Sequence, residues 1–128
     1  MKQILLLAIL GAAFLLTGCM GGQAKAAYRR VSSEEAQQIM KNESGYQIVD
    51  VRTHEEYASG HIPNAICIPN ESIGKEPPAE LADKKQMLLV YCRSGRRSKD
   101  AANKLVALGY ENVVDFGGII DWHGEIVK

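Results

Sequence analysis

One cysteine in this chain ends a strongly apolar stretch, and an arginine-rich loop follows it. Residues 87–91 read Met-Leu-Leu-Val-Tyr, Cys92 comes next, and the following six residues read Arg-Ser-Gly-Arg-Arg-Ser. From Arg97 to Leu108 the apolar residues have helical spacing. A strand that delivers a cysteine into a tight loop at the start of a helix favours a reactive thiolate, because backbone N–H groups and the helix dipole stabilise the anion.

The loop after Cys92 is predicted to bind an anion as well as to activate the sulfur. Its backbone N–H groups can point toward the sulfur in an arrangement of the oxyanion-hole type. Gly95 permits a backbone conformation that a side chain would resist, and the guanidinium groups attract an anionic substrate. The candidate site therefore consists of the nucleophile Cys92 and a binding loop of Arg93, Ser94, Gly95, Arg96, Arg97 and Ser98.

Strands and helices are predicted to alternate along the chain. Short apolar runs bounded by turn residues predict strands over residues 28–31, 46–51, 65–69, 87–91 and 113–116. Two capping boxes, Ser32 with Glu35 and Thr53 with Glu56, predict helices that begin at these residues. Further helical turns are expected over residues 79–84 and 119–122, and a turn at residues 117–118.

This alternation predicts an α/β fold with a parallel sheet covered on both faces. In such sheets ligands bind beyond the carboxyl ends of the strands. Cys92 lies at the carboxyl end of the most apolar predicted strand. Topology and chemistry therefore indicate the same place.

The N-terminus is interpreted as a targeting leader and not as part of the fold. Lys2 precedes an uncharged apolar run over residues 4–16, which is too short to span a bilayer as a permanent helix. The run ends in Leu-Thr-Gly-Cys, at Cys19, which resembles the bacterial lipobox. The resemblance implies a signal peptide over residues 1–18, lipidation of Cys19, and a flexible tether over residues 19–27. An ordinary signal peptide cut elsewhere and an uncleaved anchor are the alternatives.

We therefore expect one domain over residues 28–128, held by lipid on the outer side of a bacterial membrane. Removing residues 1–18 takes away Lys2 alone among the charged residues, so 15 Lys and Arg become 14 against 15 Asp and Glu. The formal net charge of this mature chain is −1. Such a balance gives no reason to expect a nucleic-acid partner.

The three cysteines of the chain are expected to have three different roles. Cys19 would be consumed by lipidation, and Cys92 is the nucleophile. Cys67 lies between two isoleucines in an apolar strand and is expected to pack in the core; a resolving cysteine for Cys92 is the alternative. No metal and no other cofactor is expected, because the cysteines and histidines lack metal-binding spacing.

Three segments resemble the signatures of the rhodanese family, in the family's order. The first, over residues 50–65, reads Asp-Val-Arg-Thr-His-Glu-Glu-Tyr-Ala-Ser-Gly-His-Ile-Pro-Asn-Ala. The second, over residues 90–98, contains Cys92 and its loop. The third, over residues 117–122, reads Gly-Gly-Ile-Ile-Asp-Trp. Because all three occur in order, the resemblance is specific.

This resemblance implies a single three-layer α/β/α domain with a five-stranded parallel sheet. It also implies sulfur transfer by a ping-pong route, in which Cys92 takes a sulfane sulfur from a donor such as thiosulfate and carries it as a persulfide. The acceptor would be cyanide or a thiol. Asp50 and Arg52 are given no chemical step, and we expect a structural ion pair between them. The protein is expected to be a monomer.

Other functions for the same loop are a phosphatase, a non-catalytic sulfane-sulfur binding or sensing module, and an extracytoplasmic thiol-redox protein. The related phosphatases have arginine six residues after the cysteine, whereas this chain has Ser98 there, which disfavours phosphatase activity. The non-catalytic binding or sensing module remains an alternative function, because a fold does not fix its function. The absence of Cys-x-x-Cys disfavours a dedicated disulfide oxidoreductase.

Overall fold

The computed structural model describes residues 27–128, which include the whole predicted domain. The predicted signal peptide over residues 1–18, the lipidation site Cys19 and residues 20–26 of the tether lie outside the described residues. Within residues 27–128, no helix is both long and apolar enough to cross a membrane.

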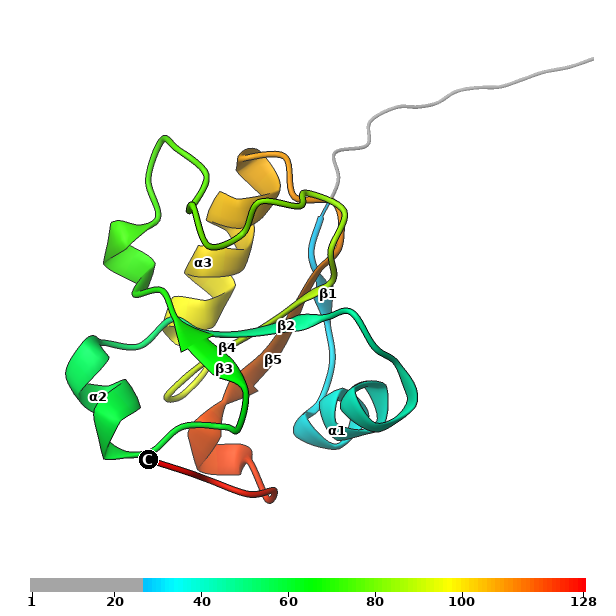
Figure 1. The fold of residues 1–128 in the computed structure, drawn as a ribbon, viewed down its shortest axis with the longest axis vertical. Coiled ribbons are helices and arrows are strands. Elements are labelled where there is room, and N and C mark those ends of the chain that lie inside the picture. Colours follow the sequence, from blue (N-terminus) through cyan, green and yellow to red (C-terminus); the bar gives the residue numbers. More distant parts are fainter. Residues whose placement is uncertain (1–26) are drawn as a thin grey trace, which may run out of the picture.

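A five-stranded parallel sheet forms the centre of the molecule (Figure 1). Its strands are β1 (Arg29–Arg30), β2 (Gln47–Asp50), β3 (Ala65–Cys67), β4 (Leu88–Cys92) and β5 (Val113–Gly118). Their order in space is β1-β5-β4-β2-β3, and every neighbouring pair is parallel. The central strand β4 is buried along its whole length, as expected for a continuous apolar run. The predicted parallel α/β sheet is confirmed.

Three α-helices connect these strands, namely α1 (Ser33–Asn42), α2 (His54–Ser59) and α3 (Arg96–Ala107). The two predicted capping boxes are present. Ser32 Oγ accepts the amide of Glu35 at the start of α1, and Thr53 Oγ1 accepts the amide of Glu56 at the start of α2. Each glutamate accepts the amide of its capping residue in return. These bonds satisfy N–H groups that a first helical turn leaves free.

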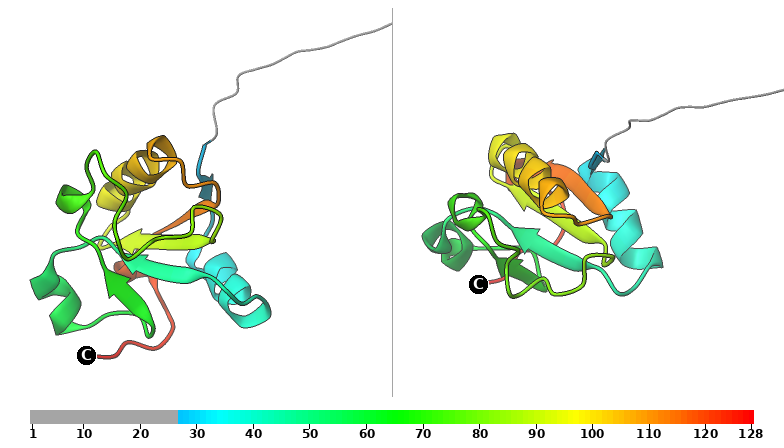
Figure 2. Two further views of the ribbon diagram at one scale, coloured as in Figure 1. Left: turned by 45° about the horizontal axis from the view of Figure 1, so that its top comes forward. Right: turned by 90° about the horizontal axis from the view of Figure 1, so that it is seen from above.

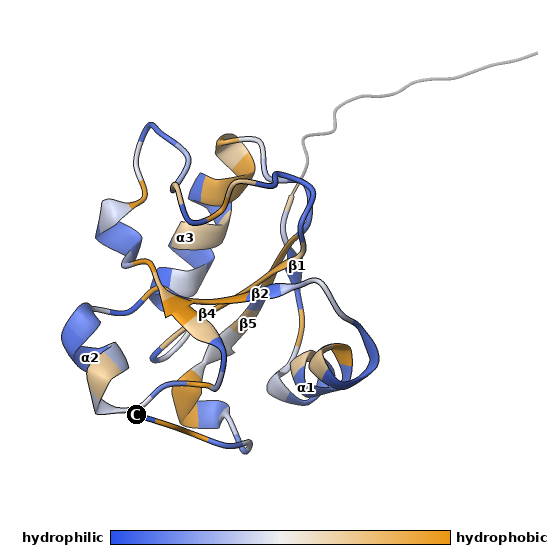
Figure 3. Ribbon diagram, viewed as in Figure 1, coloured by the Kyte–Doolittle hydropathy of each residue, from blue (hydrophilic) through white to orange (hydrophobic). Residues whose placement is uncertain are grey.

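Helices cover both faces of the sheet, which gives the predicted three layers. Val90 and Cys92 of β4 pack in one core cluster with Leu105 of α3. Leu89 of β4 packs in a second cluster with Ala36 of α1. Because successive strand side chains point to opposite faces, α1 and α3 lie on opposite sides of the sheet (Figure 2). The hydropathy colouring shows the apolar residues concentrated along the strands between them (Figure 3).

Two local predictions were wrong. Residues 79–84 form no helix; residues 79–80 are a turn in which the amide of Leu81 bonds to Pro78 O at 3.0 Å. The hydroxyl of Tyr110 donates to Leu81 O at 2.6 Å and so occupies a carbonyl that a continuing helix would use. Residues 117–118 lie inside β5 and not in a turn after it. The expected helical turn follows directly, as the 3₁₀ helix η3 (Ile119–Asp121).

Candidate active site

Cys92 lies at the carboxyl end of the central strand, on the α3 face of the sheet. The residue is only 1% exposed. Its Sγ accepts a hydrogen bond from the backbone N–H of Gly95 at 3.0 Å, so the loop turns back over the sulfur. Within the described part of the chain, the amides of the other loop residues make no hydrogen bond to Sγ. Of the amides expected to surround the sulfur, the Gly95 amide is therefore the one bonded to Sγ among the described residues.

The start of α3 has no side-chain cap, unlike the starts of α1 and α2. Its N-cap residue is Gly95, whose φ of +104° lies in the left-handed region that glycine adopts without strain. Glycine has no side chain that could accept the first amides of the helix. Unsatisfied N–H groups at a helix start bind anions readily. The start of α3 therefore lies beside Cys92 without a side-chain cap, an arrangement that favours an anion there.

The three loop arginines have different surroundings. Arg97 forms two hydrogen bonds with Glu56 of α2, Nη1 to Oε1 at 2.7 Å and Nη2 to Oε2 at 3.0 Å. Arg93 and Arg96 are exposed, and neither forms an ion pair within residues 27–128. Arg97 is thus fixed between α2 and the loop, whereas Arg93 and Arg96 present their charge to solvent.

Electrostatics connects this ion pair with the sulfur. The hydrogen bonds from Arg97 are the main cause that lowers the pKa of Glu56 to about 2. The bond to Glu56 is likewise the main cause that raises the pKa of Arg97, and the charge of Cys92 acts in the same direction. Both partners stay charged at neutral pH, so Glu56 offsets part of the positive potential that Arg97 brings to the loop.

A buried carboxylate holds the far end of the loop. Ser98 donates its hydroxyl to Asp115 Oδ1 at 2.8 Å, and the amide of Gly117 donates to the same oxygen at 2.9 Å. Asp115 is completely buried, and its Oδ2 has no hydrogen-bond partner among the described residues. Arg30 Nη1 lies 3.6 Å from this oxygen. Arg30 therefore compensates the buried charge from the edge strand β1.

The two glycines of the third signature bring β5 close to the loop. A Cβ on Gly118 would collide with the carbonyl oxygen of Arg93. The amide of Ile120 donates to that carbonyl at 3.3 Å. The absence of a side chain at residue 118 thus allows the strand end to contact the loop backbone directly.

The expected ion pair between Asp50 and Arg52 is present next to the loop strand. Arg52 donates to both carboxylate oxygens of Asp50, with Nη2 at 2.7 Å from Oδ2. Tyr91 donates its hydroxyl to the same Oδ2 at 2.8 Å. Burial is the largest cause that raises the pKa of Tyr91, so this hydroxyl remains a donor. The three side chains join the ends of β2 and β4.

Cys67 lies on the opposite face of the sheet from Cys92. The strand register pairs Cys67 with Asp50 and Asp50 with Tyr91, so these three side chains share a face, and Cys92 points to the other. Two strand spacings, about 10 Å, separate β3 from β4, whereas a disulfide needs Cα atoms within about 7 Å. Burial raises the pKa of the Cys67 thiol to about 11. These facts disfavour the alternative role of Cys67 as a resolving cysteine.

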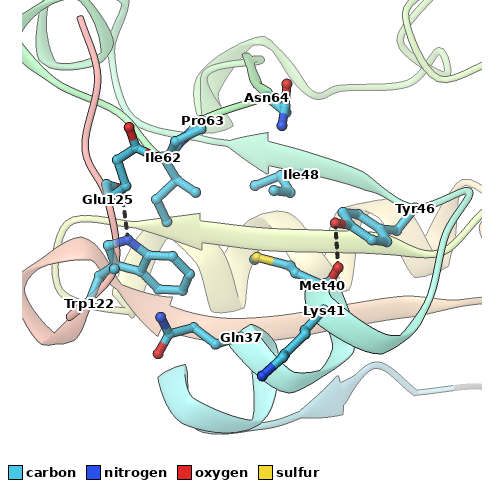
Figure 4. A pocket seen from close by; sticks show the side chains of 11 residues that line it. Gln37, Met40, Lys41, Tyr46, Ile48, Ile62, Pro63, Asn64, Trp122 and Glu125 are labelled. Atoms are coloured by element: carbon cyan, nitrogen blue, oxygen red, sulfur yellow. Dashed lines mark hydrogen bonds between the residues drawn. The ribbon is translucent and has the colours of Figure 1, made fainter.

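A hollow of about 310 Å³ lies on the α1 face of the sheet, away from Cys92 (Figure 4). Met40, Ile48, Ile62 and Trp122 are among the residues that line it. Neither cysteine of the domain borders it, so it contains no thiol. Within residues 27–128, no group of three or more His, Cys, Asp or Glu side chains could hold a metal ion.

Three residues that support the loop were not predicted from the sequence. Glu56 was assigned to a capping box, but its bond to Arg97 depends on how α2 approaches α3. Asp115 interrupts an apolar strand, and a lone carboxylate there is a usable signal, because a buried charge requires partners. Arg30 gave no signal, since nothing local distinguishes it from the adjacent Arg29.

Fold and site together define a class of protein: an α/β domain that holds a buried cysteine at the end of its central parallel strand, under a loop that starts a helix. Residues 32–125 match the family model described as a rhodanese-like domain. The chain belongs to this family.

Named relatives and solved structures agree. A sulfurtransferase of Allochromatium vinosum is 36% identical over 99 residues, which cover 73% of this chain and 89% of that protein. The thiosulfate sulfurtransferase PspE of Escherichia coli is 36% identical over 73 residues, 57% of this chain and 70% of that protein. A solved structure of a rhodanese with anions from E. coli has a TM-score of 0.59 at 37% identity and covers 65% of this chain and 98% of that one.

Some relatives are much longer than this chain. The matches to two proteins named adenylyltransferase and sulfurtransferase, from Ogataea parapolymorpha and Candida albicans, span 20% and 24% of the length of those proteins. The likeness to them therefore concerns one domain.

Proposed function

We propose that the protein is a sulfurtransferase that moves a sulfane sulfur from a small anionic donor, such as thiosulfate, to a thiophilic acceptor, cyanide or a thiol. The observation that carries the proposal is the position of Cys92 Sγ, which receives the amide of Gly95 at the uncapped start of α3. The names of the relatives that are sulfurtransferases support the same chemistry.

The reaction has two half-reactions. The Cys92 thiolate attacks the outer sulfur of thiosulfate; the donor S–S bond breaks, sulfite leaves with the electron pair, and Cys92 carries a persulfide anion. Cyanide or a thiolate then attacks the outer sulfur of this persulfide, and Cys92 leaves as thiolate. Charge and electrons balance in each half, so neither requires an oxidant or reductant. Ping-pong kinetics follow from the covalent intermediate.

The loop residues stabilise negative charge in both half-reactions. The amides at the start of α3 face an anion that is present throughout the cycle. The exposed guanidinium groups of Arg93 and Arg96 attract an anionic donor. Arg97, which is paired with Glu56, and Ser98, which is bonded to Asp115, hold the loop in place.

Access to the sulfur is part of the proposal. Cys92 is 1% exposed, so a donor reaches Sγ when the loop over residues 93–95 moves outward. The carbonyl of Arg93 and the amide of Gly95 are the loop groups bonded to Ile120 and to the sulfur. Gly95 O also accepts Ser98 Oγ at 3.2 Å and the amide of Lys99 at 3.3 Å, so the opening pivots at Gly95 while Ser98 stays bonded to Asp115.

Mass spectrometry of the purified protein before and after incubation with thiosulfate tests the proposal. The wild type should gain one sulfur atom, about 32 Da, and Cys92→Ser should gain none. Cys67→Ser is the matched control and should behave as the wild type. Added cyanide should remove the sulfur and yield thiocyanate.

Three other outcomes would change the conclusion. An unmodified wild-type protein would overturn the donor half-reaction. A Cys92 that also resists small alkylating reagents would show that the sulfur is closed to solvent, and the enzymatic proposal would fall. A stable persulfide that neither cyanide nor thiols remove would favour the sensing module over the enzyme.

The proposed location is the outer side of a bacterial membrane, with the domain held by lipid on Cys19. The proposal is supported by the leader and lipobox pattern of residues 1–19. Radiolabelled palmitate should enter the wild type and not Cys19→Ala. Labelling that survives this substitution would refute the lipid site.

A further inference from the structure

A second hollow, of about 470 Å³, lies beside the loop at the end of β5. The residues that line it include Arg30, Ser33, Glu34, Gly117, Asp121 and His123. They come from β1, from the first turn of α1, from the end of β5 and from the segment after it. None of the three sequence signatures contains Arg30, Ser33 or Glu34.

The hollow adjoins the sulfur through a short chain of contacts. A Cβ at Gly95 would lie 3.6 Å from Gly117 Cα and 3.5 Å from Arg30 Nη2. Gly95 itself donates its amide to Cys92 Sγ. Gly95, which does not line the hollow, thus separates it from the sulfur, and a thiol held there reaches the persulfide when Gly95 moves outward with the loop.

The guanidinium of Arg30 is available for a ligand. Its side chain is 55% exposed, and its contact with Asp115 Oδ2, at 3.6 Å, is an ion pair without a hydrogen bond. Among the described residues Arg30 makes no side-chain hydrogen bond. Its planar set of N–H donors suits a carboxylate.

Besides Arg30 and His123, the ionisable side chains that line the hollow are the carboxylates Glu34 and Asp121. Glu34 and Asp121 are exposed, and neither is in an ion pair within residues 27–128. Ser33 is 7% exposed, and its buried Oγ has no hydrogen-bond partner in the same part of the structure. A dianion would meet these carboxylates unfavourably, whereas a ligand with one carboxylate and one ammonium group matches both signs.

We propose that this hollow binds the polar end of a small zwitterionic thiol, an α-amino acid with a thiol side chain, which is the sulfur acceptor. The inference rests on the proposed sulfurtransferase function and specifies its acceptor. Arg30 holds the carboxylate, and Asp121 with Glu34 holds the ammonium group. The acceptor thiolate attacks the outer sulfur of the Cys92 persulfide, the S–S bond breaks, and Cys92 leaves as thiolate while the acceptor becomes a persulfide.

Acceptor kinetics with the persulfidated protein test this proposal, with L-cysteine and the uncharged 2-mercaptoethanol as probes. Arg30→Gln should lower kcat/KM for L-cysteine about tenfold more than kcat/KM for 2-mercaptoethanol and for cyanide, whose common loss reports the weakened contact with Asp115. Arg29→Gln is the matched control, because Arg29 is the neighbouring exposed arginine of β1 and does not line the hollow. It should change none of the three values.

Asp121→Asn and L-serine provide independent readouts. Asp121→Asn should lower kcat/KM for L-cysteine but not for 3-mercaptopropionate, because 3-mercaptopropionate has no ammonium group. L-Serine, which has the zwitterion but no thiol, should compete with L-cysteine and leave the cyanide reaction unchanged.

Equal losses for L-cysteine and 2-mercaptoethanol in Arg30→Gln would overturn the acceptor site, since they would indicate loop damage. Absence of competition by L-serine would also overturn it. Failure of the proposed function itself looks different: the wild type would form no persulfide with thiosulfate.

Discussion

Helices α1 and α2 begin with the same pattern of residues, but only the pattern at α2 contacts the loop that follows Cys92. Ser32 and Glu35 form a capping box at α1, and Thr53 and Glu56 form one at α2. Glu35 has no further side-chain partner among the described residues. Glu56 binds Arg97 through both carboxylate oxygens. The capping box at the start of α2 thus also holds the loop at the start of α3.

The difference lies in tertiary position and not in sequence. The first turn of α2 lies within reach of the first turn of α3, which carries Arg97. Hydrogen bonds from Ser32 lower the pKa of Glu35, whereas the bonds from Arg97 lower the pKa of Glu56 further, to about 2. A capping glutamate with a second, charged partner thus links local helix stability to the geometry of the site.

Reversing the charge at residue 97 should have the largest effect. Arg97→Glu places a carboxylate against Glu56 and beside the sulfur, so we expect kcat/KM for thiosulfate to fall at least about tenfold. A neutral sulfane donor should lose much less. Initial rates of thiocyanate formation at low ionic strength measure both.

A double variant that exchanges the two charges separates the effect of Arg97 on the position of the loop from its effect on the electrostatic potential. Glu56→Arg combined with Arg97→Glu restores an ion pair, so stability to urea should recover while the thiosulfate rate stays low. As a control, Glu35→Arg in α1 should leave the rates with thiosulfate and with the neutral donor unchanged. Equal losses for anionic and neutral donors in Arg97→Glu would contradict the electrostatic part of this account.

Removal of the caps should have a smaller, matched effect on stability. Ser32→Ala and Thr53→Ala should each lower the free energy of unfolding by about 1 kcal/mol, as measured by urea denaturation. Only Thr53→Ala should also lower the sulfur-transfer rate, because Glu56 loses a bond that orients it toward Arg97. Equal rate losses in the two variants would mean that α1 and α2 support the loop alike.

Around neutral pH a change in acidity should have the smallest effect, because Glu56 stays ionised there. The pKa of Glu56 is about 2 in the folded protein against an ordinary 4.5, so its contribution to stability is complete above about pH 4.5 and is lost as the pH falls toward 2. Glu56→Gln should therefore flatten the decline of stability in this window. Glu35→Gln should flatten it less, and urea midpoints measured between pH 2 and 5 compare the two. An unchanged profile in Glu56→Gln would show that the ion pair does not stabilise the fold.

Much of the fold was predictable because its signals are local. The capping boxes, the apolar run before Cys92 and the glycine after α3 each specify an element within a few residues. The order of the strands did not follow from such signals, although the family resemblance supplied their number. The failed helical turn over residues 79–84 has the same cause, since the hydroxyl that captures Leu81 O belongs to Tyr110, far along the chain.

The site, too, was predictable only where its residues are close together in the sequence. Cys92 and its loop form one continuous segment, so their position between the central strand and the next helix was predictable. The supports of the loop come from three other elements: Glu56 from α2, Asp115 from β5 and Arg30 from β1. Their contacts depend on how the layers are packed, and a single sequence does not display that packing.

The close approach of Gly118 to the carbonyl of Arg93 makes the position of the loop depend on the absence of a side chain at residue 118. Any β-carbon there has to push the Arg93 peptide outward and draw the Gly95 amide away from the sulfur. A library randomised at this codon and selected for sulfur transfer should return glycine alone, while the same library selected for folding should tolerate small residues as well.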